Sequence, residues 1–211
     1  MANTTHLDQL RRSPAAGLTD EMAAAEVPGV VAVREIAFAP QLGVRAVPGS
    51  PSAERIERAL GVALPTWSGQ TTGDADGAHC IWLSPDEFLV VNASRKQVPG
   101  EADAAAAAIE GLPGQVIDLS GNRTIIELSG SEARAVLEKG CHVDLHPRAF
   151  QVGHAVQTLL GTIPVIIHRS ARDTYRILPR SSFAEYTVLW LIDGMREFRA
   201  AGFATRGLGG A

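Results

Sequence analysis

The sequence predicts an α+β protein in which helices cover antiparallel sheets. Two observations predict this class. Short β-rich segments bounded by Gly, Pro, Asn and Asp recur along the chain, and amphipathic helices stand between groups of them in a β-α-β-β-like order that occurs twice. A doubly wound parallel fold would instead alternate single strands with helices. We therefore expect one domain over residues 29–202, built from two halves at about 29–112 and 113–202.

The first half is predicted to follow an N-terminal arm of residues 1–28, with a short helix near 20–26. After the interruption at Pro28-Gly29, two strands with a turn at Ala39-Pro40 between them suggest a hairpin. A helix then opens at Ser50-Pro51, because Ser is a favoured N-cap and Pro suits the first helical position. A loop rich in Gly, Thr and Asp precedes a second strand pair. The expected ranges are strands 30–38 and 41–47, loop 69–77, and strands 79–83 and 87–91.

The second half is predicted from the same signals. It follows an Ala-rich helix at 101–109 that ends the first half, and it begins with a strand pair around Ser120-Gly121-Asn122, which has the composition of a hairpin turn. Ser129 and Glu132 have the spacing of a capping box before a further helix. A long helix at 182–199 and a flexible Gly-rich tail at 203–211 complete the chain. The expected strands are 116–119, 124–128, 155–160, 164–168 and 175–178.

Composition argues against several classes of partner. The net charge of −4 is spread along the chain without a basic block, so nucleic acid and anionic membranes are not expected partners. The longest apolar runs are much shorter than the ~20 residues of a membrane-spanning helix. The first residues lack the apolar core of an export signal, and the two cysteines are far apart in sequence. These features favour a reduced, cytoplasmic setting.

Motifs of independent enzymes are absent from the sequence. It contains no G-x-G-x-x-G, no phosphate-binding G-x-x-x-x-G-K-[ST], no G-x-S-x-G, no H-E-x-x-H and no C-x-x-C. We therefore expect no catalytic, cofactor-binding or metal-binding residue in this chain.

The densest polar cluster lies at residues 140–148, where a thiol, two imidazoles and a carboxylate are close in sequence. Cys141, His142 and His146 could form a zinc site, or Cys141 could be a nucleophile. Their spacing matches no paired-ligand zinc pattern, so we favour a packed thiol in a structural or interface segment.

Arg123 follows the predicted turn at Ser120-Gly121-Asn122. The segment can be an ordinary hairpin turn, or the guanidinium can hold an anion or a carboxylate of a partner.

The last helix is apolar around more than one face, which a solvent-exposed amphipathic helix does not require. We therefore expect part of it to contact another chain, directly or by supporting a sheet that does so, beside a polar rim. The candidate interface residues are Arg123, His142, Asp144, His146 and Arg148.

Five segments together resemble the gamma subunit family of heterotetrameric sarcosine oxidases. They occur in the same order as in that family, and the similarity extends over roughly residues 81–198, with a looser likeness before it. The segments are 81–89 (IWLSPDEFL), 116–124 (VIDLSGNRT), 137–150 (LEKGCHVDLHPRAF), 160–165 (LGTIPV) and 181–186 (SSFAEY).

The resemblance implies a non-catalytic subunit beside alpha, beta and delta subunits, in a complex that converts sarcosine to glycine, forms hydrogen peroxide and yields 5,10-methylenetetrahydrofolate. It places FAD, FMN, NAD, zinc and tetrahydrofolate on the other subunits. It also implies a fold similar to the folate-binding domain of the glycine-cleavage aminomethyltransferase. An alternative is a free-standing folate-binding protein or one-carbon transferase of the same fold, because fold alone does not fix function.

Overall fold

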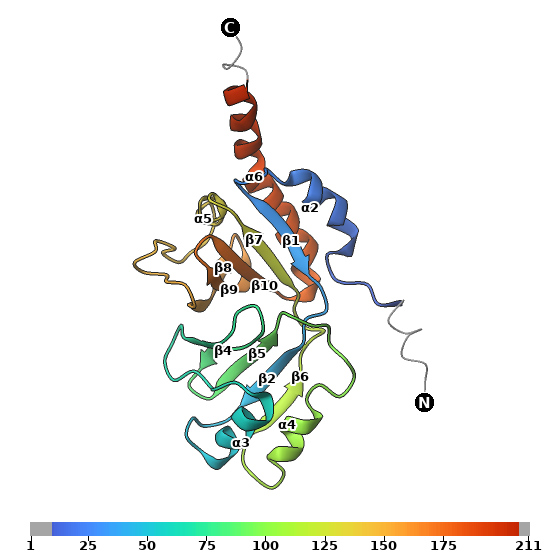
Figure 1. Cartoon of the computed structure of the whole chain (residues 1–211), viewed down its shortest axis with the longest axis vertical. Helices are drawn as coiled ribbons and strands as arrows, with labels where there is room; N and C mark the ends of the chain where they lie inside the picture. The colour runs from blue at the N-terminus through green and yellow to red at the C-terminus, as the bar shows by residue number, and fades with distance from the viewer. Residues whose placement is uncertain (1–9, 207–211) are drawn as a thin grey trace.

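The computed structural model describes the backbone of residues 10–206 and the side chains of residues 10–199. Two five-stranded antiparallel sheets pack face to face, and helices cover their outer faces (Figure 1). The predicted α+β class with antiparallel sheets is confirmed.

The first sheet has the order β3-β4-β5-β2-β6. Its strands are β2 (Gln41–Arg45), β3 (Thr71–Gly73), β4 (Ala78–Ser84), β5 (Glu87–Asn92) and β6 (Gln115–Asp118). Helices α3 (Pro51–Leu60) and α4 (Asp103–Ala108) contribute to the core on its outer face. The short strand β3 falls inside the predicted loop 69–77, where Gly and Asp conceal its strand character from sequence.

The second sheet has the order β1-β7-β10-β9-β8. Its strands are β1 (Ala32–Ile36), β7 (Ile125–Ser129), β8 (Ala155–Leu160), β9 (Ile163–Ala171) and β10 (Thr174–Pro179). The helical segments beside it are η1 (Ala16–Leu18), α2 (Thr19–Ala25), α5 (Ala133–Glu138), η2 (Ser181–Phe183) and α6 (Ala184–Arg206). The end of α6 at Arg206 places residues 203–206 of the predicted tail within this helix, whereas 207–211 lie outside the described residues.

Both hairpins predicted at the borders of the two halves are wrong. Strand β1 pairs with β7, whereas β2 pairs with β5 and β6, so residues 37–40 cross from one sheet to the other. The chain crosses back through residues 119–124, between β6 and β7. These crossings exchange β1 and β6, so the two sheets do not coincide with ranges 29–112 and 113–202. The turn residues were recognised, but turn composition does not show which strands pair.

The first core forms where α3 packs on its sheet. Ser50 caps this helix, its Oγ accepting a hydrogen bond from the Ala53 N–H at 3.3 Å, and Pro51 is the first helical residue. Gly61 ends the helix in the left-handed conformation, with φ at 67°. Ile56 is fully buried in the same cluster as Phe88 of β5.

The second core forms between its sheet and helices α2, α5 and α6. One stripe of α6 is fully buried there, comprising Ala184, Val188, Leu191 and Met195. Met22 and Ala25 of α2 join this core, so the short helix predicted in the arm is present and packed. The predicted capping box is wrong, because α5 begins after Glu132 without a side-chain cap.

The layer between the sheets combines an apolar cluster with buried polar groups. Its apolar part includes Ile81, Leu89, Ile166 and Leu178. The polar part holds two histidines, His79 and His168, and an ion pair in which Arg176 Nε donates to Glu127 Oε2 at 3.0 Å. Arg176 also donates to Asp76 Oδ1, at 2.6 Å, and thereby ties the loop after β3 to the opposite sheet.

No helix within residues 10–206 is both long enough and apolar enough to cross a membrane.

Candidate functional site

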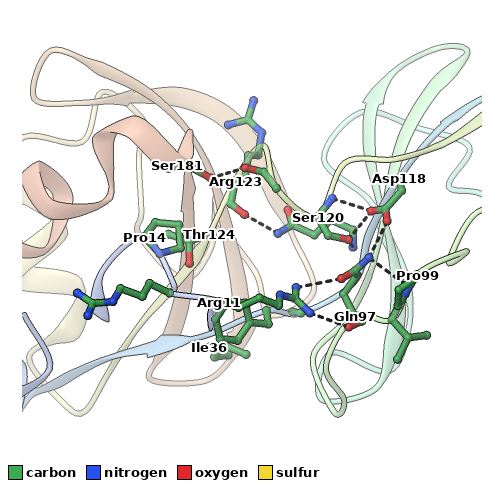
Figure 2. A pocket seen from close by; sticks show the side chains of 16 residues that line it. Arg11, Pro14, Ile36, Gln97, Pro99, Asp118, Ser120, Arg123, Thr124 and Ser181 are labelled. Carbon is green, nitrogen blue, oxygen red and sulfur yellow. Dashed lines mark hydrogen bonds between the residues drawn. The ribbon is translucent and has the colours of Figure 1, made fainter. Parts of the chain in front are cut away.

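A cavity of about 810 Å³ lies beside the two crossings between the sheets. The N-terminal segment, both crossings, the chain after β5 and the start of η2 all contribute to it (Figure 2). The residues that line it are Arg11, Arg12, Pro14, Ile36, Phe38, Ala39, Gln41, Gln97, Val98, Pro99, Asp118, Ser120, Gly121, Arg123, Thr124 and Ser181.

Arg123 is the one candidate interface residue that lines this cavity. Its guanidinium donates to the Leu178 carbonyl oxygen at 3.0 Å, and its own carbonyl accepts from Gln41 Nε2 at 2.9 Å. Burial, together with the positive charge of Arg180, lowers the pKa of Arg123. The residue therefore joins the second crossing to strands of both sheets and does not stand in the predicted hairpin turn.

A hydrogen-bond network forms one wall of the cavity. Asp118 accepts from the Ser120 hydroxyl at 2.6 Å and from Gln97 Nε2 at 2.9 Å (Figure 2). Burial alone would raise the pKa of Asp118, but these hydrogen bonds and the nearby Arg11 lower it, so the carboxylate remains ionised. The network holds the turn of the second crossing against the segment after β5.

Arg11 links the N-terminal segment to the same wall. It donates to the carbonyl oxygen of Gln97 at 3.1 Å and to Gln97 Oε1 at 2.9 Å (Figure 2). Its guanidinium also lies over the ring of Phe38, 4.6 Å from the centroid, which is cation–π geometry. Phe38 has a φ of 62°, a left-handed conformation that is uncommon for a residue other than Gly.

The other four candidate interface residues share a surface segment elsewhere. His142, Asp144, His146 and Arg148 are all exposed, whereas Leu145 and Phe150 of the same segment are buried and anchor it. Asp144 Oδ1 accepts from the backbone N–H of His146 at 2.8 Å, which fixes the local turn. Within residues 10–199, no hydrogen bond or ion pair joins Arg123 to these four.

Cys141 begins this segment in a half-buried position. Burial raises the pKa of its thiol, although a hydrogen bond from the Val143 backbone acts in the opposite direction, so a thiolate nucleophile is not favoured. Among the residues that the structure describes, no three His, Cys, Asp or Glu side chains are placed to hold a metal ion. The zinc alternative built on Cys141, His142 and His146 therefore finds no ligand set here.

The cavity is the feature that sequence reasoning missed. Gln41 lines it, is 2% exposed, and its Oε1 has no hydrogen-bond partner within the described part of the chain. Nothing in the sequence around Gln41 indicates that it lines a cavity. The cavity forms only where the two crossings, which are far apart in sequence, lie close together in the fold.

The fold defines a class of protein, a two-sheet α+β domain, and no group of metal ligands occurs among the side chains of residues 10–199. Similarity to glycine cleavage system aminomethyltransferase T from Bartonella henselae agrees with the predicted fold. The two chains share a TM-score of 0.58 at 20% identity, with 83% of this chain and 48% of that one covered. At that identity the likeness concerns the fold alone.

Residues 45–197 match the family model described as the sarcosine oxidase, gamma subunit family. The chain is 50% identical to sarcosine oxidase subunit gamma of Corynebacterium sp. (strain U-96), over 95% of this chain and 98% of that one. It is 49% identical to the same subunit from Arthrobacter sp, over 94% and 97%. The chain belongs to the sarcosine oxidase gamma subunit family, and the resemblance stated from sequence is confirmed.

A solved structure also matches, that of the heterotetrameric sarcosine oxidase from Corynebacterium sp. U-96 in complex with pyrrole 2-carboxylate. The TM-score is 0.85 at 49% identity, and the match covers 90% of this chain and 97% of the chain in that complex.

Proposed function

We propose that this chain is the non-catalytic gamma subunit of a heterotetrameric sarcosine oxidase and serves its assembly. The observation that carries the proposal is the match, over nearly the full length of both chains, to a chain of a heterotetrameric sarcosine oxidase. The reaction is the oxidative demethylation of sarcosine to glycine, with formation of hydrogen peroxide and 5,10-methylenetetrahydrofolate.

The proposal assigns the chemistry to partner chains. Alpha, beta and delta subunits are the partners, and FAD, FMN, NAD, zinc and tetrahydrofolate belong to them. Two observations support a non-catalytic role: nucleotide-binding and nucleophile motifs are absent from the sequence, and the side chains described for residues 10–199 contain no metal-ligand group. The assembly is placed in the cytoplasm, in agreement with two cysteines that are both free thiols.

The proposed contact surface begins at Phe183, the last residue of η2, and continues along the exposed side of α6. Phe183, Tyr186 and Leu189 follow one another at spacings of three residues and are 37%, 44% and 52% exposed. Such spacing places them on neighbouring positions of one helix face, opposite the stripe that packs into the core. Apolar side chains gathered in this way are typical of the centre of a protein–protein interface.

The polar segment 141–150 starts beside that helix. The Gly161 N–H donates to the Gly140 carbonyl at 2.8 Å, which closes the chain before this segment against the turn after β8. Trp190 lies over both glycines: a Cβ at Gly140 would stand 2.7 Å from its ring, and one at Gly161 would stand 3.5 Å from its Nε1. The exposed face of α6 and the segment with His142, Asp144, His146 and Arg148 thus adjoin and form what we call the assembly surface.

Arg123 stands apart from the assembly surface. Its guanidinium is used within the chain, on Leu178. A contact with a partner would therefore have to share or replace that hydrogen bond.

Purification from the native source tests the proposal. The chain, tagged at its C-terminus on the chromosome, is isolated at moderate salt, and the associated chains are identified by mass spectrometry. We expect the alpha, beta and delta subunits in equal amounts, with sarcosine-dependent peroxide formation in the same fraction. Recovery of the folded chain alone, while oxidase activity elutes elsewhere, would refute it.

A further inference from the structure

We propose that Tyr186 and Trp190 of α6 anchor a partner chain of the oxidase by donating hydrogen bonds to a backbone carbonyl oxygen of that chain. The contact rests on the proposed function and deepens it, because it names the residues that bind and the chemistry that they recognise. Tyr186 and Trp190 lie four residues apart, so they are neighbours on one side of the helix.

Trp190 lies over a platform formed by Gly140 and Gly161. The two glycines are joined by the hydrogen bond from the Gly161 N–H to the Gly140 carbonyl, and Cys141 pairs with Leu160 beside them. A Cβ at Gly140 would stand 2.7 Å from Cζ2 of the indole and 3.4 Å from Cη2, whereas a Cβ at Gly161 would stand 3.5 Å from Nε1. The six-membered ring therefore covers Gly140, and the N–H edge lies at Gly161.

The Tyr186 hydroxyl reaches the same glycine. It would stand 3.4 Å from a Cβ at Gly161, so both polar atoms lie on the side where this residue has no side chain. Gly161 has a φ of 59° in the turn between β8 and β9, a left-handed conformation that favours glycine. The turn thus leaves open the space beside the hydroxyl and the indole N–H.

Neither polar atom is satisfied within the described part of the chain. Among the side chains of residues 10–199, no hydrogen bond involves the Tyr186 hydroxyl or Trp190 Nε1. Both atoms are within reach of an outside group, since Tyr186 is 44% exposed and the unpaired atoms that are enclosed belong to Gln41 and His168. Tyrosine and tryptophan with free polar ends are typical of the residues that dominate protein–protein contacts.

The chemistry of the platform favours a neutral oxygen as the acceptor. An indole nitrogen can only donate, which excludes an ammonium or guanidinium group from this position. A carboxylate would need a spare positive charge, but Lys139, which precedes Gly140, is paired with Glu197 Oε1 at 2.7 Å and donates to the Gly194 carbonyl. A backbone carbonyl has no net charge and two lone pairs, so it can accept from both donors.

Competition between chains for the partner subunits tests the hydroxyl. The unmodified chain and a variant, in equal amounts and in excess, compete for limiting partners, and mass spectrometry of the assembled oxidase measures the uptake of each. Tyr186→Phe removes only the hydroxyl and should reduce uptake by about fivefold, the effect of one hydrogen bond. Tyr175→Phe makes the same change at a residue that is 1% exposed and should compete equally. Equal uptake of Tyr186→Phe would overturn the proposal.

A second pair of variants tests the open space beside Gly161. Gly161→Ala places a methyl group 3.4 Å from the hydroxyl and 3.5 Å from the indole nitrogen, and should reduce uptake by about tenfold or more, because both hydrogen bonds are obstructed. Gly49→Ala has a similar φ of 76° and no atom within 4 Å of its new Cβ. It should be destabilised by the same backbone strain and still compete equally. Normal uptake of a folded Gly161→Ala would contradict the proposal.

Three outcomes separate the possible occupants. The loss in Tyr186→Phe should be the same at low and high salt, and a loss that shrinks at high salt would replace the neutral carbonyl by a carboxylate. The isolated chain should be a monomer by size-exclusion chromatography, and a dimer that Tyr186→Phe dissociates would assign the anchor to a second copy of this chain. If the unmodified chain does not enter the oxidase, the proposed function fails, whereas equal uptake of the variants refutes the anchor alone.

Discussion

The imidazole rings of His79 and His168 lie against each other between the two sheets, with centroids 5.1 Å apart and planes inclined by 38°. Burial, opposed by a hydrogen bond to Gly77, lowers the pKa of His79 to about 4. Burial, the neighbouring His79 and Arg176 lower the pKa of His168 to about 3. Both rings are therefore neutral at neutral pH. Neither ring nitrogen of His168 has a partner within the part of the chain that the structure describes.

This pair predicts a loss of stability in acid. Unfolded histidines have a pKa near 6.5, so below that pH the unfolded chain binds protons that the folded chain does not. The free energy of unfolding should be unaffected above pH 6.5 and should fall from there down to about pH 4 for His79 and about pH 3 for His168. At pH 5 each histidine should remove about 2 kcal/mol.

Urea unfolding of His168→Phe tests this prediction, because the aromatic replacement has no titratable nitrogen. The loss of stability between pH 7.5 and pH 5 should shrink by about half relative to the unmodified chain. His142→Phe, at an exposed position, is the control and should leave the pH dependence unchanged. An undiminished pH dependence in His168→Phe would show that these buried rings do not cause it.

A second prediction concerns Glu127, which is bound by Arg34 from β1 and by Arg176 from β10. The side chains of Glu127 and Arg176 are only 7% and 4% exposed. Glu127→Leu removes one of the two carboxylates that pair with Arg176, the other being Asp76, and should cost about 1.5–3 kcal/mol of unfolding free energy. Arg34 is 70% exposed, and Arg34→Ala should cost less than about 1 kcal/mol. Chemical denaturation measures the unfolding free energy of both variants. Similar losses of unfolding free energy in Glu127→Leu and Arg34→Ala would contradict this prediction.

A third prediction concerns Gly140 beneath Trp190. A Cβ at Gly140 would stand 2.7 Å from the tryptophan ring, so Gly140→Ala must displace Trp190 and should cost about 1–3 kcal/mol. Gly121→Ala is the matched control, since no atom lies within 4 Å of its added Cβ, and should change stability by less than about 0.5 kcal/mol. Thermal unfolding distinguishes the two. Tryptophan fluorescence unchanged in Gly140→Ala would show that Trp190 is not displaced.

Most of the helices and strands could be predicted from the sequence, because the local sequence signals agree with the final structure. The strands predicted at 155–160, 164–168 and 175–178 match β8, β9 and β10, and their content of Val, Ile, Thr and Tyr explains why they could be predicted. The sequence did not show how the strands on either side of the two crossings pair. Ala39-Pro40 and Ser120-Gly121 are turn formers whether the chain reverses into a hairpin or passes to another sheet.

The candidate site was predictable only in part. The segment around Leu145 and Pro147 is polar in sequence, and its polar side chains are exposed while Leu145 is buried. The exposed residues are His142, Asp144, His146 and Arg148. Gln41 and the cavity depend on residues nearly 80 positions apart that meet through two crossings, as in the hydrogen bond from the Gln41 N–H to Ser120 Oγ. Contacts of this kind leave no local pattern.

A fourth prediction addresses the assembly surface. Leu189→Asp places a charge on the exposed apolar face of α6, and Arg148→Glu reverses a charge in the adjoining segment. Each should weaken assembly with the co-expressed partners by tenfold or more, while circular dichroism of the variant chain remains unchanged. Arg58→Glu, an exposed reversal on α3, should assemble normally. Normal size-exclusion profiles for Leu189→Asp and Arg148→Glu would remove both residues from the interface, and an unfolded variant would show a structural role instead.

The central claim is that this chain belongs to an oxidase without performing its chemistry. The most direct measurement is made on the isolated, folded chain, purified from a reducing cytoplasm: its absorbance between 350 and 500 nm, and its peroxide formation when sarcosine and oxygen are supplied. We expect no flavin absorbance and no sarcosine-dependent peroxide, with both appearing when the partner subunits are added. Stoichiometric flavin on the isolated chain, or peroxide formed by it alone, would contradict the account.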